Sequence, residues 1–274
     1  MYSINCRGKL LSLQKPLVMG IINVTDDSFY KESRNTSVNE ALIGIETLIN
    51  EGADIIDIGG QSTRPGSIRY SAEEELIKIR PVIKEAVKNF PNSVFSVDTY
   101  HAQVAEETVE LGIAIVNDIS AGNMDDNMLY TVANLKVPFI CMHSKGKPET
   151  MHLNPEYENI TREILEFFIA KVNTCSEEGI VDLILDPGFG FGKTIAHNFE
   201  LLKNLEAFKV LNKPIMVGLS RKSLIYKTFG NTAADALNGT SVLNTIALLK
   251  GASILRVHDV PEAKQAVLLA QKSG

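Results

Sequence analysis

Short apolar segments alternate with longer amphipathic segments along almost the whole chain. The short segments are rich in β-branched residues and predict strands at 16–22, 53–58, 93–97, 114–118, 137–142, 182–186, 214–218 and 253–257. The longer segments predict helices near 38–50, 72–88, 101–112, 124–134, 156–178, 197–209, 235–250 and 260–271. Several of the strands are apolar on both faces, which is typical of a buried parallel sheet.

Eight strand–helix units in about 250 residues predict an α/β protein with the (β/α)8 TIM barrel fold. A doubly wound sheet is the alternative, but it usually has fewer strands and a nucleotide fingerprint that this chain lacks. No linker rich in Pro, Gly or Ser interrupts the pattern. We therefore expect a single domain over residues 1–274, in which residues 1–15 form an N-terminal lead-in segment.

Composition and charge narrow the class of protein. The chain is 45% hydrophobic and 22% charged, as in ordinary soluble proteins. Its net charge of -6 argues against nucleic acid or an anionic membrane as a partner, and no run is apolar enough to span a bilayer. The start of the chain has no secretory signal, and Cys6, Cys141 and Cys175 lack zinc-type spacing. We expect reduced thiols and a cytoplasmic location.

The segment LDPGFGFGKT, residues 185–194, superficially looks like a phosphate-binding loop. A P-loop needs a glycine where this chain has Pro187, and the dinucleotide fingerprint needs one where it has Lys193. We instead expect the glycines to let the backbone pass close to a flat ligand. Lys193 and Thr194 need not touch phosphate and can simply lead into the next helix.

Polar residues follow all eight predicted strands. A single such residue is more often a helix cap or a turn former, but the C-terminal ends of barrel strands converge on one mouth, where active sites lie. A cationic set with two polar neighbours favours an anionic substrate such as a diphosphate: Arg64, Lys222, Arg256, His258, Asn23 and Ser223. A second set suits a flat heterocycle with several N–H donors: Asp98, Asn117, Asp186, Met142 and Phe191.

Eight segments together resemble the dihydropteroate synthase family of folate biosynthesis. They are VMGIINVTDDSF, GADIIDIGGQSTRPGS, SVDTY, VNDIS, CMHSKGKPETM, LDPGFGFGKT, VGLSRKS and GASILRVHDV, in order from about residue 16 to the C-terminus. The resemblance implies a (β/α)8 barrel, usually a homodimer, with Mg2+ as cofactor. It implies a transferase of EC class 2.5 that condenses 6-hydroxymethyl-7,8-dihydropterin diphosphate with p-aminobenzoate, giving dihydropteroate and pyrophosphate. Sulfonamides compete with p-aminobenzoate in that family.

The resemblance also implies a role for each site residue. The pterin would contact Asp98, Asn117, Met142, Asp186, Phe191 and Lys222. The diphosphate would contact Asn23, Thr63, Arg64, Arg256 and His258, with Mg2+ beside Asn23. The p-aminobenzoate would contact Phe29, Arg64, Pro65 and Ser223. The catalytic residues of a dissociative displacement at the pterin methylene carbon would be Asp98, Asp186, Lys222 and Arg256.

The first loop departs from the family pattern. Asp26 stands where the family has proline, Lys31 where it has an acidic residue, and Glu32-Ser33 where it has a glycine pair. Gln61 replaces the usual glutamate before Ser-Thr-Arg-Pro. Because proline and glycine set the stiffness and allowed dihedrals of a loop, we expect weaker binding of sulfonamides relative to p-aminobenzoate.

Three alternative functions are left open by the residues themselves. A pterin-dependent methyltransferase shares the barrel and the pterin slot, but it has no diphosphate to hold. A catalytically silent pterin-binding paralogue is favoured only by the altered first loop. A metalloenzyme is disfavoured because no His, Cys or Asp ligand spacing is present.

Overall fold

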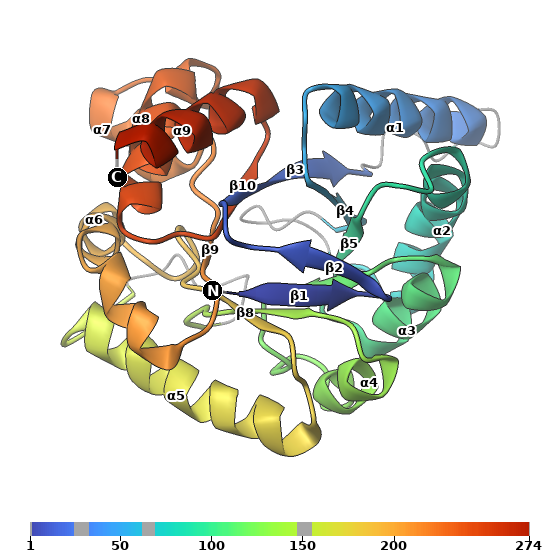
Figure 1. Cartoon of the computed structure of the whole chain (residues 1–274), viewed down its shortest axis with the longest axis horizontal. Coiled ribbons are helices and arrows are strands. Elements are labelled where there is room, and N and C mark those ends of the chain that lie inside the picture. The colour runs from blue at the N-terminus through green and yellow to red at the C-terminus, as the bar shows by residue number, and fades with distance from the viewer. Residues whose placement is uncertain (1, 25–32, 62–68, 147–154, 274) are drawn as a thin grey trace.

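The chain folds as a closed barrel of eight parallel strands surrounded by helices (Figure 1). The computed structural model describes residues 2–24, 33–61, 69–146 and 155–273, with only the backbone of residues 33–37. The strands lie in the order β8-β7-β6-β5-β4-β3-β10-β9, and a bridge between Leu185 and Ile215 joins the two edges. The prediction of a TIM barrel is confirmed, and the doubly wound alternative is wrong.

The elements alternate along the chain much as the sequence predicts. The barrel strands are β3 (Leu17–Asn23), β4 (Ile55–Gly59), β5 (Phe95–Asp98), β6 (Ile115–Asp118), β7 (Phe139–Met142), β8 (Leu183–Asp186), β9 (Met216–Val217) and β10 (Ile254–Val257). The α-helices are α1 (Ser33–Asn50), α2 (Ala72–Asn89), α3 (Ala102–Leu111), α4 (Met128–Leu135), α5 (Ile160–Glu178), α6 (Ile195–Lys203), α7 (Ser223–Phe229), α8 (Leu237–Leu249) and α9 (Val260–Ser273). Two 3-10 helices, η1 (Leu205–Leu211) and η2 (Ala233–Ala236), follow α6 and α7.

Several elements differ from the prediction. Helix α1 begins at Ser33, five residues before the predicted start at 38. The predicted helix 197–209 is divided at Asn204 into α6 and the 3-10 helix η1. Helix α7 was not predicted, because its 7 residues are too few to show a helical period in the sequence.

Alternation along the strands divides the barrel interior into layers. An apolar floor near the N-terminal end is formed by inward side chains that include Ile55, Ile115, Ile140, Ile184 and Ile254. The next residue of each strand faces the helices and joins the main core: Ile56, Val116, Cys141, Leu185 and Leu255. At the following inward position the aliphatic side chains of the floor give way to carboxylate, amide, thioether and guanidinium groups: Asp57, Asn117, Met142, Asp186 and Arg256. The period of two therefore builds a reactive layer above the floor.

A hairpin closes the floor from outside. Strands β1 (Ser3–Cys6) and β2 (Lys9–Ser12) pair antiparallel through a turn at Arg7 and Gly8, whose φ values of 55° and 88° suit a two-residue hairpin. Ile4 and Cys6 are buried in the same cluster as the floor residues. Figure 1 shows this hairpin lying across the end of the barrel that faces the viewer. The lead-in segment thus acts as a plug.

None of the helices that the structure describes has the length and apolar character needed to cross a bilayer. The three cysteines are buried and unpaired, as expected for reduced thiols.

The plug predicts a clear contrast between two hairpin positions. Ile4→Ala should lower the free energy of unfolding by about 2–4 kcal/mol, because it leaves a cavity against the barrel floor. Ile4 is 2% exposed, whereas Leu10 on the same hairpin is 73% exposed. Leu10→Ala is therefore the control, and it should change the free energy of unfolding by less than about 0.5 kcal/mol. Urea unfolding measures both, and equal effects would contradict the plug.

Candidate active site

The C-terminal ends of the strands bring the predicted polar residues together. Residues of four neighbouring strands pair in one row: Asn23, Gly59, Asp98 and Asn117. Met142 of β7 pairs with Asp186 of β8 in the same way. Arg256 lies in β10, and Lys222 precedes α7. The convergence that the strand ends predicted is present.

Arg256 is the centre of a buried ion cluster. Its Nε lies 2.7 Å from Oδ2 of Asp57 on β4, and its Nη2 lies 2.6 Å from Oδ2 of Asp98 on β5. Asn117 donates from Nδ2 to the same Asp57 oxygen at 3.0 Å. One guanidinium therefore joins β10 to β4 and β5, and it fixes two carboxylates and an amide in the reactive layer.

Asp57 is a site residue that the sequence analysis missed. It is fully buried, and its Oδ1 has no hydrogen-bond partner among the described residues. The signal was available, since Asp57 interrupts the apolar run ADIIDIG two positions after the floor residue Ile55. Asn117 and Arg256 follow their own floor residues at the same spacing.

The cluster shifts the pKa values of its members in opposite directions. Burial raises the pKa of Asp98 to about 7, helped by Asp57 and opposed by Arg256. Burial also works against the charge on Arg256, but Asp57 and Asp98 outweigh it and raise the pKa of the guanidinium. Arg256 stays charged, while Asp98 is harder to ionise than an ordinary aspartate.

A second charged pair lies on the other side of the barrel. Burial raises the pKa of Asp186, whose Oδ1 accepts the backbone N–H of Gly188 at 2.8 Å. Burial lowers the pKa of Lys222 to about 8, although Asp186 opposes this shift. The ammonium donates to the carbonyl of Phe189 and lies 4.7 Å from the ring centroid of Phe191. This side combines an acceptor, a donor and an aromatic face.

A small apolar cluster adjoins Asp186 and Lys222. Met142 packs in a small buried cluster with Tyr100, Ile119, Met124 and Phe191. Met142 and Phe191 were predicted for this role, whereas the other three were not. A slot with apolar faces and polar groups on its edges suits a flat heterocycle.

The mouth of the barrel carries the remaining described residues. His258 is exposed, its Nδ1 lies 3.1 Å from Oγ of Ser220, and that oxygen accepts the backbone N–H of His258 at 3.2 Å. Desolvation and the neighbouring Arg256 lower the pKa of His258. Asn23 is exposed at the end of β3, and Ser223 opens α7.

Four predicted residues lie outside the described residues: Phe29, Thr63, Arg64 and Pro65. Two other polar residues at strand ends have structural partners. Arg221 forms a bidentate pair with Asp259, with bonds of 2.8 Å and 2.9 Å, and also donates to two backbone carbonyls of η2. Asp118 accepts the backbone N–H groups of Ser120 and Gly122. Both brace loops.

The described residues contain no group of three or more His, Cys, Asp or Glu side chains that could hold a metal ion. Asn23 offers one exposed amide oxygen beside Asp98, with the two side chains on either side of Gly59. This donor fits a Mg2+ ion that takes its other ligands from phosphate and water.

Comparison with known proteins agrees with this geometry. A family model described as pterin binding enzyme matches residues 19–258. The chain belongs to the pterin-binding enzyme family. Within that family, the dihydropteroate synthase of Haemophilus influenzae is 43% identical over 254 residues, which cover 92% of this chain and 92% of the relative.

Solved structures of the family share the barrel. The crystal structure of Yersinia pestis dihydropteroate synthase in a sulfonamide drug complex has a TM-score of 0.93 and 36% identity, and the match covers 99% of both chains. Xanthomonas albilineans dihydropteroate synthase with 4-aminobenzoic acid has a TM-score of 0.91 and 36% identity, over 99% of this chain and 97% of that one. The resemblance to dihydropteroate synthase in folate biosynthesis is confirmed.

The family departure at Gln61 has a structural context. The Gln61 amide donates to Oε2 of Glu75 at 2.8 Å, and Tyr100 donates its hydroxyl to the Gln61 carbonyl at 2.6 Å. Gln61 also bonds the backbone of Tyr70. Gln61 and Tyr70 stand near the two ends of segment 62–68, so the glutamine side chain ties these ends together.

Glu75 of this network predicts a pH-dependent stability. Burial raises its pKa from 4.5 to about 7, opposed by hydrogen bonds from Gln61 and Thr99. The folded state therefore favours the protonated form. The stabilisation of the folded state by protonated Glu75 is complete below about pH 4.5 and is lost as pH rises through about 7. The free energy of unfolding changes by about 3 kcal/mol at most through this loss.

Urea unfolding between pH 5 and pH 8 tests this assignment. The free energy of unfolding of Glu75→Gln should fall less with rising pH than that of the wild type, because the amide does not titrate. The control is Glu73→Gln in the same helical turn, where Glu73 is exposed, and it should keep the wild-type slope. Equal slopes in all three proteins would contradict the role of Glu75.

Proposed function

We propose that the chain condenses 6-hydroxymethyl-7,8-dihydropterin diphosphate with p-aminobenzoate, releasing dihydropteroate and pyrophosphate. The observation that carries this proposal is the layer of charged groups in which Asp186 and Lys222 lie near enough to Asp98 and Arg256 to influence one another's pKa values. A relative named dihydropteroate synthase that matches along 92% of this chain supports it. The enzyme is a transferase of folate synthesis.

The pterin ring offers amino and ring N–H donors on one edge and acceptors on others. Carboxylates at Asp98 and Asp186 suit the donors, and the amide of Asn117 and the ammonium of Lys222 suit the acceptors. Met142 and Phe191 supply the apolar faces. Each of these residues has a described partner that fixes its position or packs against it.

The chemistry proposed is dissociative displacement at the pterin methylene carbon. The bond to the diphosphate oxygen breaks first and leaves a cation delocalised into the ring. Asp98 and Asp186 favour that positive charge, while Arg256 and His258 favour the departing anion. The neutral aryl amine then attacks the carbon and loses its proton, without a strong base.

The diphosphate would bind at the mouth of the barrel. Asn23, Arg256 and His258 reach the mouth, and Thr63 and Arg64 join them by family resemblance. Mg2+ held at Asn23 and on the substrate would neutralise charge on the leaving group. The p-aminobenzoate site stays a prediction from the resemblance, with Ser223 at its described edge.

We also propose a homodimer in the cytoplasm. Exposed apolar side chains gather on α7, α8 and α9: Phe229, Val242, Leu249, Leu268 and Leu269. Such side chains are suitable for packing against a second copy. Sedimentation of the wild type, with Leu269→Glu as the variant, distinguishes the dimer from a monomer.

The test is a coupled measurement on the purified protein. Incubation with the pterin diphosphate, Mg2+ and p-aminobenzoate should give pyrophosphate and dihydropteroate in equal amounts. Pyrophosphate alone would mean that the amine site has lost its function. Neither product, with the pterin still bound, would favour a silent paralogue, and a methyltransferase would not consume the diphosphate.

The same assay tests the altered first loop. Relative to a family member with the Pro and Gly-Gly loop, the ratio of the sulfamethoxazole inhibition constant to the p-aminobenzoate KM should be higher. Inhibition by sulfamethoxazole as strong as in that relative would contradict the proposed effect of Asp26 and Lys31.

Replacement of Asp57 should lower the activity, although in the proposed mechanism its side chain does not contact the reacting atoms. Asp57→Asn keeps the size of the side chain but removes the charge that holds Nε of Arg256, so kcat/KM for the pterin diphosphate should fall about 100-fold. The control is Glu107→Gln, which breaks a surface ion pair with Arg80 and should change kcat/KM less than about twofold. A kcat/KM for Asp57→Asn within threefold of the wild type would contradict the role.

A further inference from the structure

We propose that Lys193 is a positioning residue that holds the pterin wall in place and takes no part in binding the diphosphate. This inference rests on the proposed function and adds a residue to it. Lys193 belongs to the GKT sequence of the glycine loop, where a lysine would ordinarily suggest phosphate binding. Its surroundings indicate another role.

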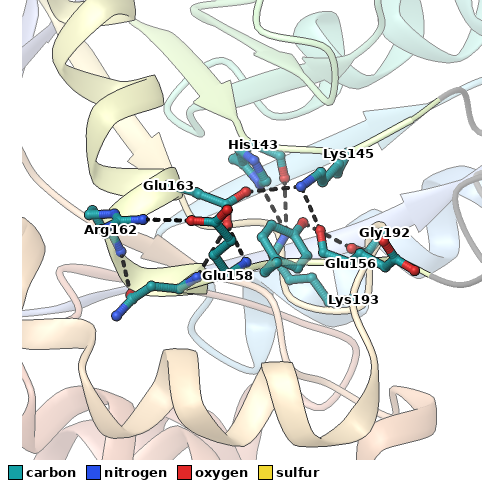
Figure 2. Close-up of polar contacts among 10 residues, drawn as sticks. His143, Lys145, Glu156, Glu158, Arg162, Glu163, Gly192 and Lys193 are labelled. Carbon is teal, nitrogen blue, oxygen red and sulfur yellow. Dashed lines mark hydrogen bonds and ion pairs between the residues drawn. The ribbon is translucent and has the colours of Figure 1, made fainter.

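The ammonium of Lys193 has no free donor for an anion. Its Nζ lies 2.8 Å from the carbonyl oxygen of Gly188, 3.0 Å from that of Phe191 and 3.3 Å from that of His143. It also lies 3.1 Å from Nδ1 of His143. Three N–H groups thus face four acceptors, and the residue is 9% exposed. Figure 2 shows this side chain directed at His143.

The acceptors belong to the two segments that build the slot. Gly188 donates its backbone N–H to the carboxylate of Asp186, and Phe191 carries the ring that faces Lys222. His143 follows Met142 at the end of β7. The Lys193 side chain therefore joins the glycine loop to the end of β7, the two segments that carry Asp186, Phe191 and Met142.

The glycine loop needs such an anchor because its backbone is unusual. Gly188, Gly190 and Gly192 all have positive φ, at 69°, 85° and 62°. A Cβ on Gly188 would lie 1.9 Å from the carbonyl oxygen of His143, and one on Gly192 would lie 2.3 Å from that of Lys145. The two segments are in close backbone contact, and their carbonyl groups at this contact require donors.

Neighbouring contacts join the glycine loop and the end of β7 to the residues at the start of α5. Tyr157 donates its hydroxyl to the Gly192 carbonyl at 2.9 Å, and Lys145 donates to the Glu156 carbonyl at 2.6 Å and to Glu163 at 2.9 Å (Figure 2). No carboxylate pairs with Lys193 within ion-pair distance among the described residues. Burial lowers the pKa of Lys193 well below the ordinary value for lysine, and the charge of Asp186 opposes this shift. The cost of burying this amine fits a residue kept for geometry.

Two ligands separate positioning from anion binding. Calorimetric titration would use 6-hydroxymethylpterin, which has no phosphate, and inorganic pyrophosphate with Mg2+. In Lys193→Met the affinity for 6-hydroxymethylpterin should fall at least tenfold, while that for pyrophosphate stays within twofold. The control is Lys203→Met, an exposed lysine of the next helix, which should change neither affinity.

Other outcomes would overturn the inference. Loss of pyrophosphate affinity with pterin affinity unchanged would make Lys193 an anion ligand. A lower Tm with both affinities unchanged would make it a purely structural residue. Failure of the wild type to bind 6-hydroxymethylpterin would instead overturn the proposed function.

A second measurement does not depend on the folding of a variant. In the 15N-lysine spectrum of the wild type, the Lys193 ammonium signal should be protected from exchange and should shift when 6-hydroxymethylpterin is added. A Lys193 signal that shifts with pyrophosphate alone would contradict the positioning role.

Discussion

The site depends on one interaction, the guanidinium of Arg256 held between Asp57 and Asp98. Two carboxylates buried in one layer would repel each other and lose water, so neither would stay ionised without a cation between them. Arg256 supplies that cation from β10, and it reaches both carboxylates only because β10, β3, β4 and β5 are neighbours in the closed barrel. Barrel closure and site electrostatics are therefore a single constraint: the register of the strands places the charges, and the charges tie together strands that lie far apart in sequence.

The segments around the site are held at their ends by side chains. Gln61 joins the ends of segment 62–68 through the backbone of Tyr70, and Lys145 joins those of segment 147–154 through the carbonyl of Glu156. The glycine loop is held by Lys193 in the same manner. A polar side chain at each base sets where a segment leaves the barrel. The described residues that flank the site are thus fixed by side-chain hydrogen bonds to the backbone.

Much of the fold could be predicted because apolar strands repeat with a clear period. The position of the site was predictable for the same reason, since polar residues end every strand. Asp57 was missed because it looks like part of a buried strand, and its partner Arg256 is 199 residues away. The partners of Lys193 were equally hidden, as His143 lies 50 residues upstream. The plug was missed because strands of 4 residues carry too weak an alternation. Pairings across the barrel leave no local pattern in a sequence.

The charges of the reactive layer suggest how binding and chemistry are divided. The carboxylates of Asp57, Asp98 and Asp186 outnumber the cations of Lys222 and Arg256. Such an interior favours a ring that becomes positive, but it cannot by itself attract a diphosphate. In the proposed function, the positive charge for the leaving group would come from Mg2+ and, as the family resemblance implies, from Arg64. Burial raises the pKa of Asp98, which works against the ionised form while no positive ring lies beside it. In the proposed mechanism, a ring that gains positive charge would favour the ionised form of Asp98, so the negative charge of the layer would increase at the step where the positive charge forms.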